Sequence, residues 1–126
     1  VAAESTKLGD THGQWGLVPI WGMSRRLPER VGRSTAKELM FTSRRITGLE
    51  AAEIGLVDHA IPDDDLDSFV DSLVAEICEN SWDTNRIVKK LIAGGDERSR
   101  EESLLWERTQ PFGMPRDMRE RMNQDR

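Results

Sequence analysis

The stretch from Asp10 to Met23 constrains the fold of this chain more than any other. It contains glycines at positions 13, 16 and 22, tryptophans at positions 15 and 21, Pro19, and one of the two histidines, His12. Glycine permits positive φ and close approach by a ligand or by another backbone segment. Proline fixes φ and donates no hydrogen bond. The stretch therefore predicts a rigid loop between the end of a strand and the start of a helix, and we expect any chemical site to lie here.

Composition excludes several classes of function. The chain has 126 residues, a length typical of one domain, with 37% hydrophobic and 33% charged residues. Its net charge of −5 argues against a nucleic acid or an anionic membrane surface as the main partner. Cys78 is the only cysteine, which excludes an internal disulfide and a zinc site built from several cysteines, and it favours a cytoplasmic location. No metal-ligand cluster is evident, and no apolar run is long enough to cross a membrane.

Local patterns predict two extended segments near the N-terminus and a mostly helical remainder. We expect extended structure at 1–3 and 8–12. On a strand over 8–12 the side chains of Asp10 and His12 would lie on the same face, about 7 Å apart. The sequence does not decide whether these two side chains touch. Capping boxes that begin at Thr35, Thr47 and Ser99 predict three helix starts. Further expected elements are a strand over 56–61, helices over 66–78, 82–92 and about 115–123, and a core-facing apolar stripe on the first of these helices that includes Cys78.

The chain begins with Val1-Ala2-Ala3, which is typical of the tail of a strand and has no initiator methionine. The predicted opening strands need partners that this chain does not supply. We therefore expect the chain to be one piece of a longer protein or a processed product.

Several stretches in order resemble the C-terminal half of the crotonase (enoyl-CoA hydratase/isomerase) superfamily. Family members typically read G-L-x-P-x-x-G-G-x-x-R-L-P-R-x-V-G and then A-x-E-L-x-L-T-G-x-x-I-x-A-x-E-A-x-x-x-G-L-V. The matching segments here are 16–19, 22–32, 36–46 and 51–58. The resemblance implies an α/β fold, a crotonase-like spiral of ββα turns represented by its mostly helical C-terminal portion. Residues 1–62 would be the end of the spiral core, with the active-site loop at 10–23, and residues 63–126 a C-terminal helical region of the kind that forms trimers.

The same resemblance implies an acyl-CoA substrate, no separate cofactor, and a homotrimer or hexamer. In such enzymes two backbone N–H groups hold the thioester oxygen and stabilise an enolate. Those donors and one of two catalytic glutamates normally come from the N-terminal half, which would then be an obligatory partner of this chain. The other glutamate normally lies in P-E-x-x-x-G, but here His12 occupies its position.

The resemblance implies an enoyl-CoA hydratase, which adds water to a 2,3-enoyl-CoA thioester. We predict His12 and Asp10 as catalytic residues, because an imidazole can take up or deliver a proton near neutral pH and a carboxylate can orient it. Asp-Thr-His before a glycine is also typical of local turn hydrogen bonding, so a purely structural role stays open. The predicted substrate-binding residues are Thr11, Gly16, Pro19, Ile20 and Trp21.

Several alternatives stay open. The tryptophans at 15 and 21 could instead serve the core or a subunit contact, and His59 is expected to be structural. With His12 and Asp10 the chain could belong to a hydrolase or a C–C-bond-cleaving enzyme of the same superfamily. It could also be a non-catalytic fragment that only binds acyl-CoA or mediates oligomerisation.

Overall fold

The computed structural model describes residues 1–96 and 98–124 and divides the chain into two compact units, Val1–Ser72 and Leu73–Arg126. The division lies within helix α4 (Leu66–Glu79), whereas the sequence suggested a division after residue 62. None of the described helices is long and apolar enough to cross a membrane.

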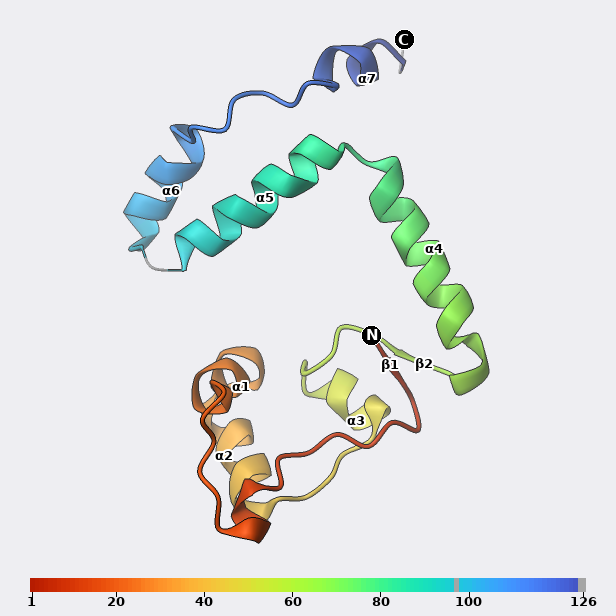
Figure 1. The fold of residues 1–126 in the computed structure, drawn as a ribbon, viewed down its shortest axis with the longest axis vertical. Coiled ribbons are helices and arrows are strands. Elements are labelled where there is room, and N and C mark those ends of the chain that lie inside the picture. The colour runs from red at the N-terminus through yellow and green to blue at the C-terminus, as the bar shows by residue number, and fades with distance from the viewer. Residues whose placement is uncertain (97, 125–126) are drawn as a thin grey trace. The chain divides into compact units, whose positions relative to one another are not determined.

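The first unit contains a short parallel sheet. Strand β1 (Ala2–Ala3) pairs with β2 (Ala60–Ile61), with Ala2 opposite Ala60, and the two strands lie side by side in Figure 1. An isolated antiparallel bridge joins Leu8 to Ile46 through two backbone hydrogen bonds of 2.9 and 2.8 Å. This bridge holds the segment before the glycine-rich loop against the segment before α3 (Gly48–Glu53).

Two consecutive helices follow the loop. Helix α1 (Met23–Val31) begins after Gly22, and Gly32 connects it directly to α2 (Arg33–Thr42), which packs against it (Figure 1). The helix predicted to start at Thr35 is present but starts earlier. Because Gly32 alone separates the two helices and serves as the N-cap of α2, Thr35 lies inside the first turn and makes no capping hydrogen bond.

The core of the first unit forms where α2, α3 and the bridge meet. Leu39, Ile46 and Ala51 are buried there, and Leu8 and Leu56 pack against them. The predicted capping box at the start of α3 is confirmed, since Thr47 Oγ1 accepts from the Glu50 amide at 3.2 Å and Glu50 Oε2 accepts from the Thr47 amide at 2.8 Å. The core thus brings together segments that are distant in sequence.

The strand predicted over 56–61 is wrong for most of its length, because only Ala60–Ile61 is extended. Gly55 takes a left-handed φ of 74°. The amides of Leu56 and Val57 then both donate back to the carbonyl of Ala51, at 2.8 and 3.2 Å. These amides close the C-terminus of α3 and are not available for a sheet.

The apolar stripe of α4 is also not buried as predicted. The short 3₁₀ turn η2 (Asp63–Asp65) leads into this helix, in which no residue is fully buried and Cys78 is exposed. The expectation of a buried Cys78 is therefore wrong. The periodicity correctly predicted an amphipathic helix, but burial of its apolar face depends on a neighbouring surface, which periodicity does not report.

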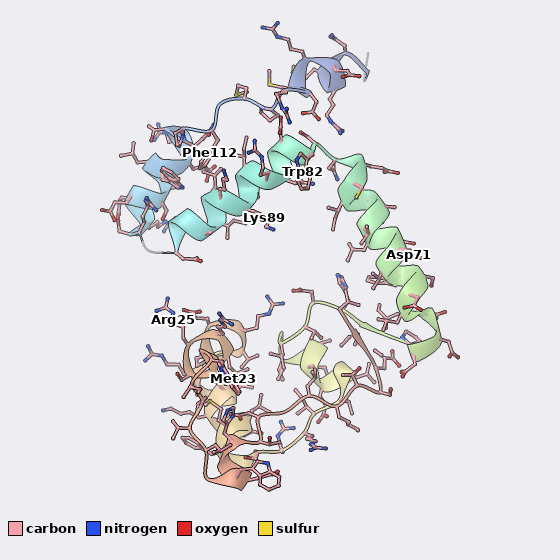
Figure 2. The ribbon with its side chains drawn as sticks, in the orientation of Figure 1. Met23, Arg25, Asp71, Trp82, Lys89 and Phe112 are labelled. Atoms are coloured by element: carbon pink, nitrogen blue, oxygen red, sulfur yellow. The ribbon has the colours of Figure 1, made fainter. Side chains whose placement is uncertain are left out.

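In the second unit, all the secondary-structure elements that the structure describes are helices. It contains α5 (Trp82–Gly95), α6 (Arg100–Arg108) and α7 (Met118–Gln124), and α6 packs against α5. The predicted capping box of α6 is confirmed through Ser99 and Glu102. Phe112, labelled with Trp82 and Lys89 in Figure 2, meets Trp106 edge-on at 5.7 Å between ring centroids and so holds the segment after α6 on this helix pair.

Candidate active site

The turn that carries His12 forms by local hydrogen bonding. Residues His12–Trp15 are a 3₁₀ helix, η1, not the end of a strand as predicted. The carboxylate of Asp10 accepts a hydrogen bond from the backbone amide of His12 at 3.0 Å, which bends the chain at Thr11. The expectation that Asp10 and His12 share a strand face is therefore wrong, and the turn brings the two side chains closer than a strand would.

Asp10 and His12 form a hydrogen-bonded dyad. Oδ1 of Asp10 contacts Nδ1 of the His12 ring. The same carboxylate oxygen therefore accepts hydrogen bonds from both the backbone amide and the ring of His12. The Asp10 side chain is 3% exposed, whereas the His12 side chain is 21% exposed. An ionised carboxylate only accepts hydrogen bonds, so Nδ1 carries the proton and Nε2 is the ring nitrogen left for another partner.

The surroundings of Asp10 favour its charged form on balance. Burial raises the pKa of its carboxyl group, but the hydrogen bonds from the backbone and ring of His12 outweigh burial and hold the pKa below its ordinary value. An apolar cavity of about 200 Å³ lies beside the carboxylate. The apolar side chains that line it are Leu8, Met23, Leu27, Leu39, Ile46 and Leu56.

The loop after the dyad turn exposes large apolar side chains. Gly16 ends η1 with a left-handed φ of 65°, and Trp15 and Trp21 are 74% and 77% exposed. The Trp21 ring lies 6.3 Å from the His12 ring, measured between centroids, at a tilt of 60°. The helix that follows begins at Met23, which Figure 2 labels.

The structure therefore brings only some of the predicted site residues together. Asp10, His12 and Trp21 form one cluster, and Thr11 lies between the first two as the residue that precedes η1. Ile20 is 77% exposed, and Pro19 is partly buried. Their substrate-binding roles stay predictions.

Sequence patterns did not point to two further residues beside the dyad turn. Nε2 of Gln14 donates to the backbone carbonyl of Ser43 at 3.4 Å, and Ser43 itself is 4% exposed. Residues 14 and 43 are far apart in sequence, so no local signal links them.

His59 lies apart from the dyad, with its ring 5.1 Å from that of Phe69. Among the described residues, no group of three or more histidine, cysteine or acidic side chains could hold a metal ion.

Comparison with known proteins identifies the family. A sequence model described as "Enoyl-CoA hydratase/isomerase" matches residues 1–119. The chain belongs to the enoyl-CoA hydratase/isomerase family. A probable enoyl-CoA hydratase of Mycobacterium tuberculosis is 32% identical over 108 residues, which are 86% of this chain and 42% of the relative. The resemblance predicted from sequence motifs is thus confirmed.

Solved structures of the family confirm the crotonase fold. The crystal structure of an enoyl-CoA hydratase from Bacillus anthracis aligns with a TM-score of 0.81 and 34% identity, over 84% of this chain and 41% of that chain. A putative enoyl-CoA hydratase from Thermobifida fusca, in complex with acetoacetyl-CoA, aligns with a TM-score of 0.80 and 31% identity, over 85% and 42% of the two chains. The chain therefore spans about two fifths of the length of the family members that it matches.

Proposed function

We propose that this chain contributes an Asp–His dyad to an acyl-CoA enzyme of the enoyl-CoA hydratase type, which adds water to a 2,3-enoyl-CoA thioester. The observation that carries the proposal is the hydrogen bond from His12 Nδ1 to the buried carboxylate of Asp10. This bond leaves Nε2 of a partly exposed imidazole for proton transfer. An imidazole held by a carboxylate can take up and return a proton without moving away from its partner.

In the proposed reaction, His12 removes a proton from water and then delivers the same proton to the substrate. His12 Nε2 removes a proton from water while the water oxygen bonds to C3 of the enoyl group. The electron pair of the C2–C3 double bond then shifts toward the thioester and gives an enolate. The imidazolium returns its proton to C2, which completes the addition of water. Asp10 orients the ring and stabilises the imidazolium through its negative charge.

The enolate oxygen needs hydrogen-bond donors. We propose that these come from a segment equivalent to the part of the relatives that this chain does not match. The coverage of about two fifths of each relative supports this assignment. In the complete enzyme the dyad would supply proton transfer, and the other segment would supply the electrostatic stabilisation.

A CoA thioester is proposed as the substrate, with no separate cofactor. The two putative enoyl-CoA hydratase structures from Thermobifida fusca, in complex with CoA and with acetoacetyl-CoA, support this class of substrate. The exposed apolar side chains of the loop, among them Trp15 and Trp21, offer surface that an acyl-CoA could cover.

Hydrolysis of the thioester is the second candidate function. The feature that favours it is the same dyad, because a carboxylate-oriented imidazole is also suited to activate water for attack on a carbonyl carbon. In this reaction the C–S bond breaks, and the products are a carboxylic acid and the free thiol of CoA. The two candidate reactions are distinguished by their products, since hydration leaves the thioester intact.

We further propose a homotrimer or hexamer in the cytoplasm. Exposed apolar side chains of the second unit, such as Trp82, Leu104 and Leu105, support an assembly that covers them. Sedimentation equilibrium of the purified protein would give its mass, and a monomeric mass would contradict the proposed assembly.

The function is tested on the protein isolated from its source. An intact-mass measurement first shows whether additional sequence or a second chain accompanies these residues. Crotonyl-CoA is then supplied, and both 3-hydroxyacyl-CoA and free thiol are measured. His12→Ala should lower the rate of hydration about 100-fold or more, whereas the matched control His59→Ala should not change it.

The possible outcomes separate the candidates. Equal rates for the wild type and His12→Ala would remove His12 from the mechanism. Release of free thiol instead of 3-hydroxyacyl-CoA would favour hydrolysis. Binding of acyl-CoA without turnover of any acyl-CoA tested would favour a non-catalytic role.

A further inference from the structure

Ser43 has an unusual conformation at the end of α2. Its φ of 50° and ψ of 24° are left-handed, and it is the one non-glycine residue with positive φ in the described part of the chain. A side chain in this region is sterically strained. Ser43 is 4% exposed, and its Oγ forms no hydrogen bond with any described residue. A strained residue with a buried, unpartnered hydroxyl lowers stability and requires an explanation.

Ser43 lies against the turn that carries His12. A Cβ placed on Gly13 would lie 3.0 Å from Ser43 Oγ, closer than ordinary van der Waals contact. The backbone carbonyl of Ser43 also accepts the hydrogen bond from Gln14. The two residues directly after His12, Gly13 and Gln14, thus both lie against Ser43.

Positions 13 and 43 share one small space. Gly13 has no left-handed φ, so an alanine there would not be opposed by backbone strain. Its other close neighbour, the carbonyl oxygen of Met40, would lie 3.5 Å from the added Cβ, which is an ordinary contact. The Ser43 hydroxyl is therefore the group that resists a side chain at position 13.

We propose that Ser43 is a positioning residue, and that its contact with Gly13 holds the η1 turn so that the His12 ring stays on Asp10. The dyad geometry itself does not depend on which reaction is catalysed. The expected effect on catalysis rests on the function proposed above.

The test is a double-mutant cycle with Gly13→Ala, Ser43→Gly and the double variant. A Cβ at position 13 crowds Ser43 Oγ, so the turn or the hydroxyl has to move. We expect Gly13→Ala to weaken the NMR signal of the hydrogen-bonded His12 Nδ1 proton and to lower kcat about tenfold, with KM unchanged. Glycine at position 43 removes both the strain and the hydroxyl. Because the contact with Gly13 is then lost, Ser43→Gly should also weaken the Nδ1–H signal and lower kcat. In the double variant the methyl group at position 13 takes the space that the hydroxyl leaves, so the signal and kcat should exceed those of both single variants.

Two controls accompany the cycle. His59, the second histidine of the chain, reports on general disturbance in the same spectrum and should not change. Gly95→Ala adds a Cβ at an ordinary 3.6 Å from Ser103 Oγ, at a glycine without a left-handed φ, and it should not change the His12 signal of the wild type or of Ser43→Gly. If Gly13→Ala does not fold, recovery of folding in the double variant, measured by thermal melting, supports the same contact.

Simple addition of the effects of Gly13→Ala and Ser43→Gly on the His12 signal would overturn the proposal, as would an unchanged signal in Gly13→Ala. Failure of the proposed function has a different signature. In that case no protein of the series, wild type included, turns over an acyl-CoA, while the NMR cycle still shows coupling.

Discussion

Arg116 donates three hydrogen bonds to the carboxylate of Asp83. Its Nε and backbone amide reach Oδ2 at 2.7 and 3.1 Å, and its Nη2 reaches Oδ1 at 3.0 Å. Asp83 lies in the first turn of α5, where the helix dipole also favours a negative charge. The side-chain hydrogen bond from Arg116 is the largest cause that lowers the pKa of Asp83 from 3.8 to about 2. This pair ties the segment before α7 to α5.

The Asp83–Arg116 pair predicts an acid-dependent loss of stability. Because the pKa of Asp83 is lower in the folded state, the pair contributes fully to the free energy of unfolding above about pH 4, and the contribution is lost as the pH falls toward 2. Asp83→Asn should flatten this part of the pH dependence. Urea unfolding of both proteins between pH 2 and 6 measures the difference. Asp71→Asn, at an exposed aspartate of α4, is the control, and an unchanged profile in Asp83→Asn would contradict the prediction.

Replacement of the dyad carboxylate should impair catalysis more than folding. Asp10→Asn keeps the size of the side chain but removes the charge that stabilises an imidazolium at His12. We expect kcat for the proposed hydration to fall about 100-fold, with KM nearly unchanged. Steady-state kinetics with crotonyl-CoA measure this effect. Asp58→Asn, which removes an exposed ion pair with Arg30, should retain the wild-type rate, and an equal loss in both variants would argue against a special role for Asp10.

Gly48 should not tolerate a side chain. A Cβ at this first residue of α3 would overlap the backbone carbonyl of Ala3, and backbone cannot move aside as a flexible side chain can. Gly48→Ala should lower the free energy of unfolding by about 1–3 kcal/mol, measured by urea denaturation. Gly95→Ala is the contrasting control, because its Cβ would lie at an ordinary 3.6 Å from Ser103 Oγ. A Gly48→Ala protein as stable as the wild type would refute the expected overlap.

Much of the fold and the family could be predicted from local patterns. The capping boxes at Thr47 and Ser99 predicted their helix starts because both partners lie within four consecutive residues. The spacing of glycine and proline in the loop pointed to the region around His12, because these residues also lie close together in sequence. The box at Thr35 failed because the glycine ahead of it could begin the helix earlier. Local signals indicate that an element exists more reliably than they indicate where it starts.

The sequence alone determined that this is an amphipathic, mostly helical chain of the crotonase superfamily, because its motifs and helical patterns repeat or lie close together along the backbone. Tertiary structure decided what these residues contact. It turned Asp10 onto the His12 ring and seated Ser43 against Gly13. It also left the face of α4 without full burial, because contacts depend on which surfaces the folded backbone brings together.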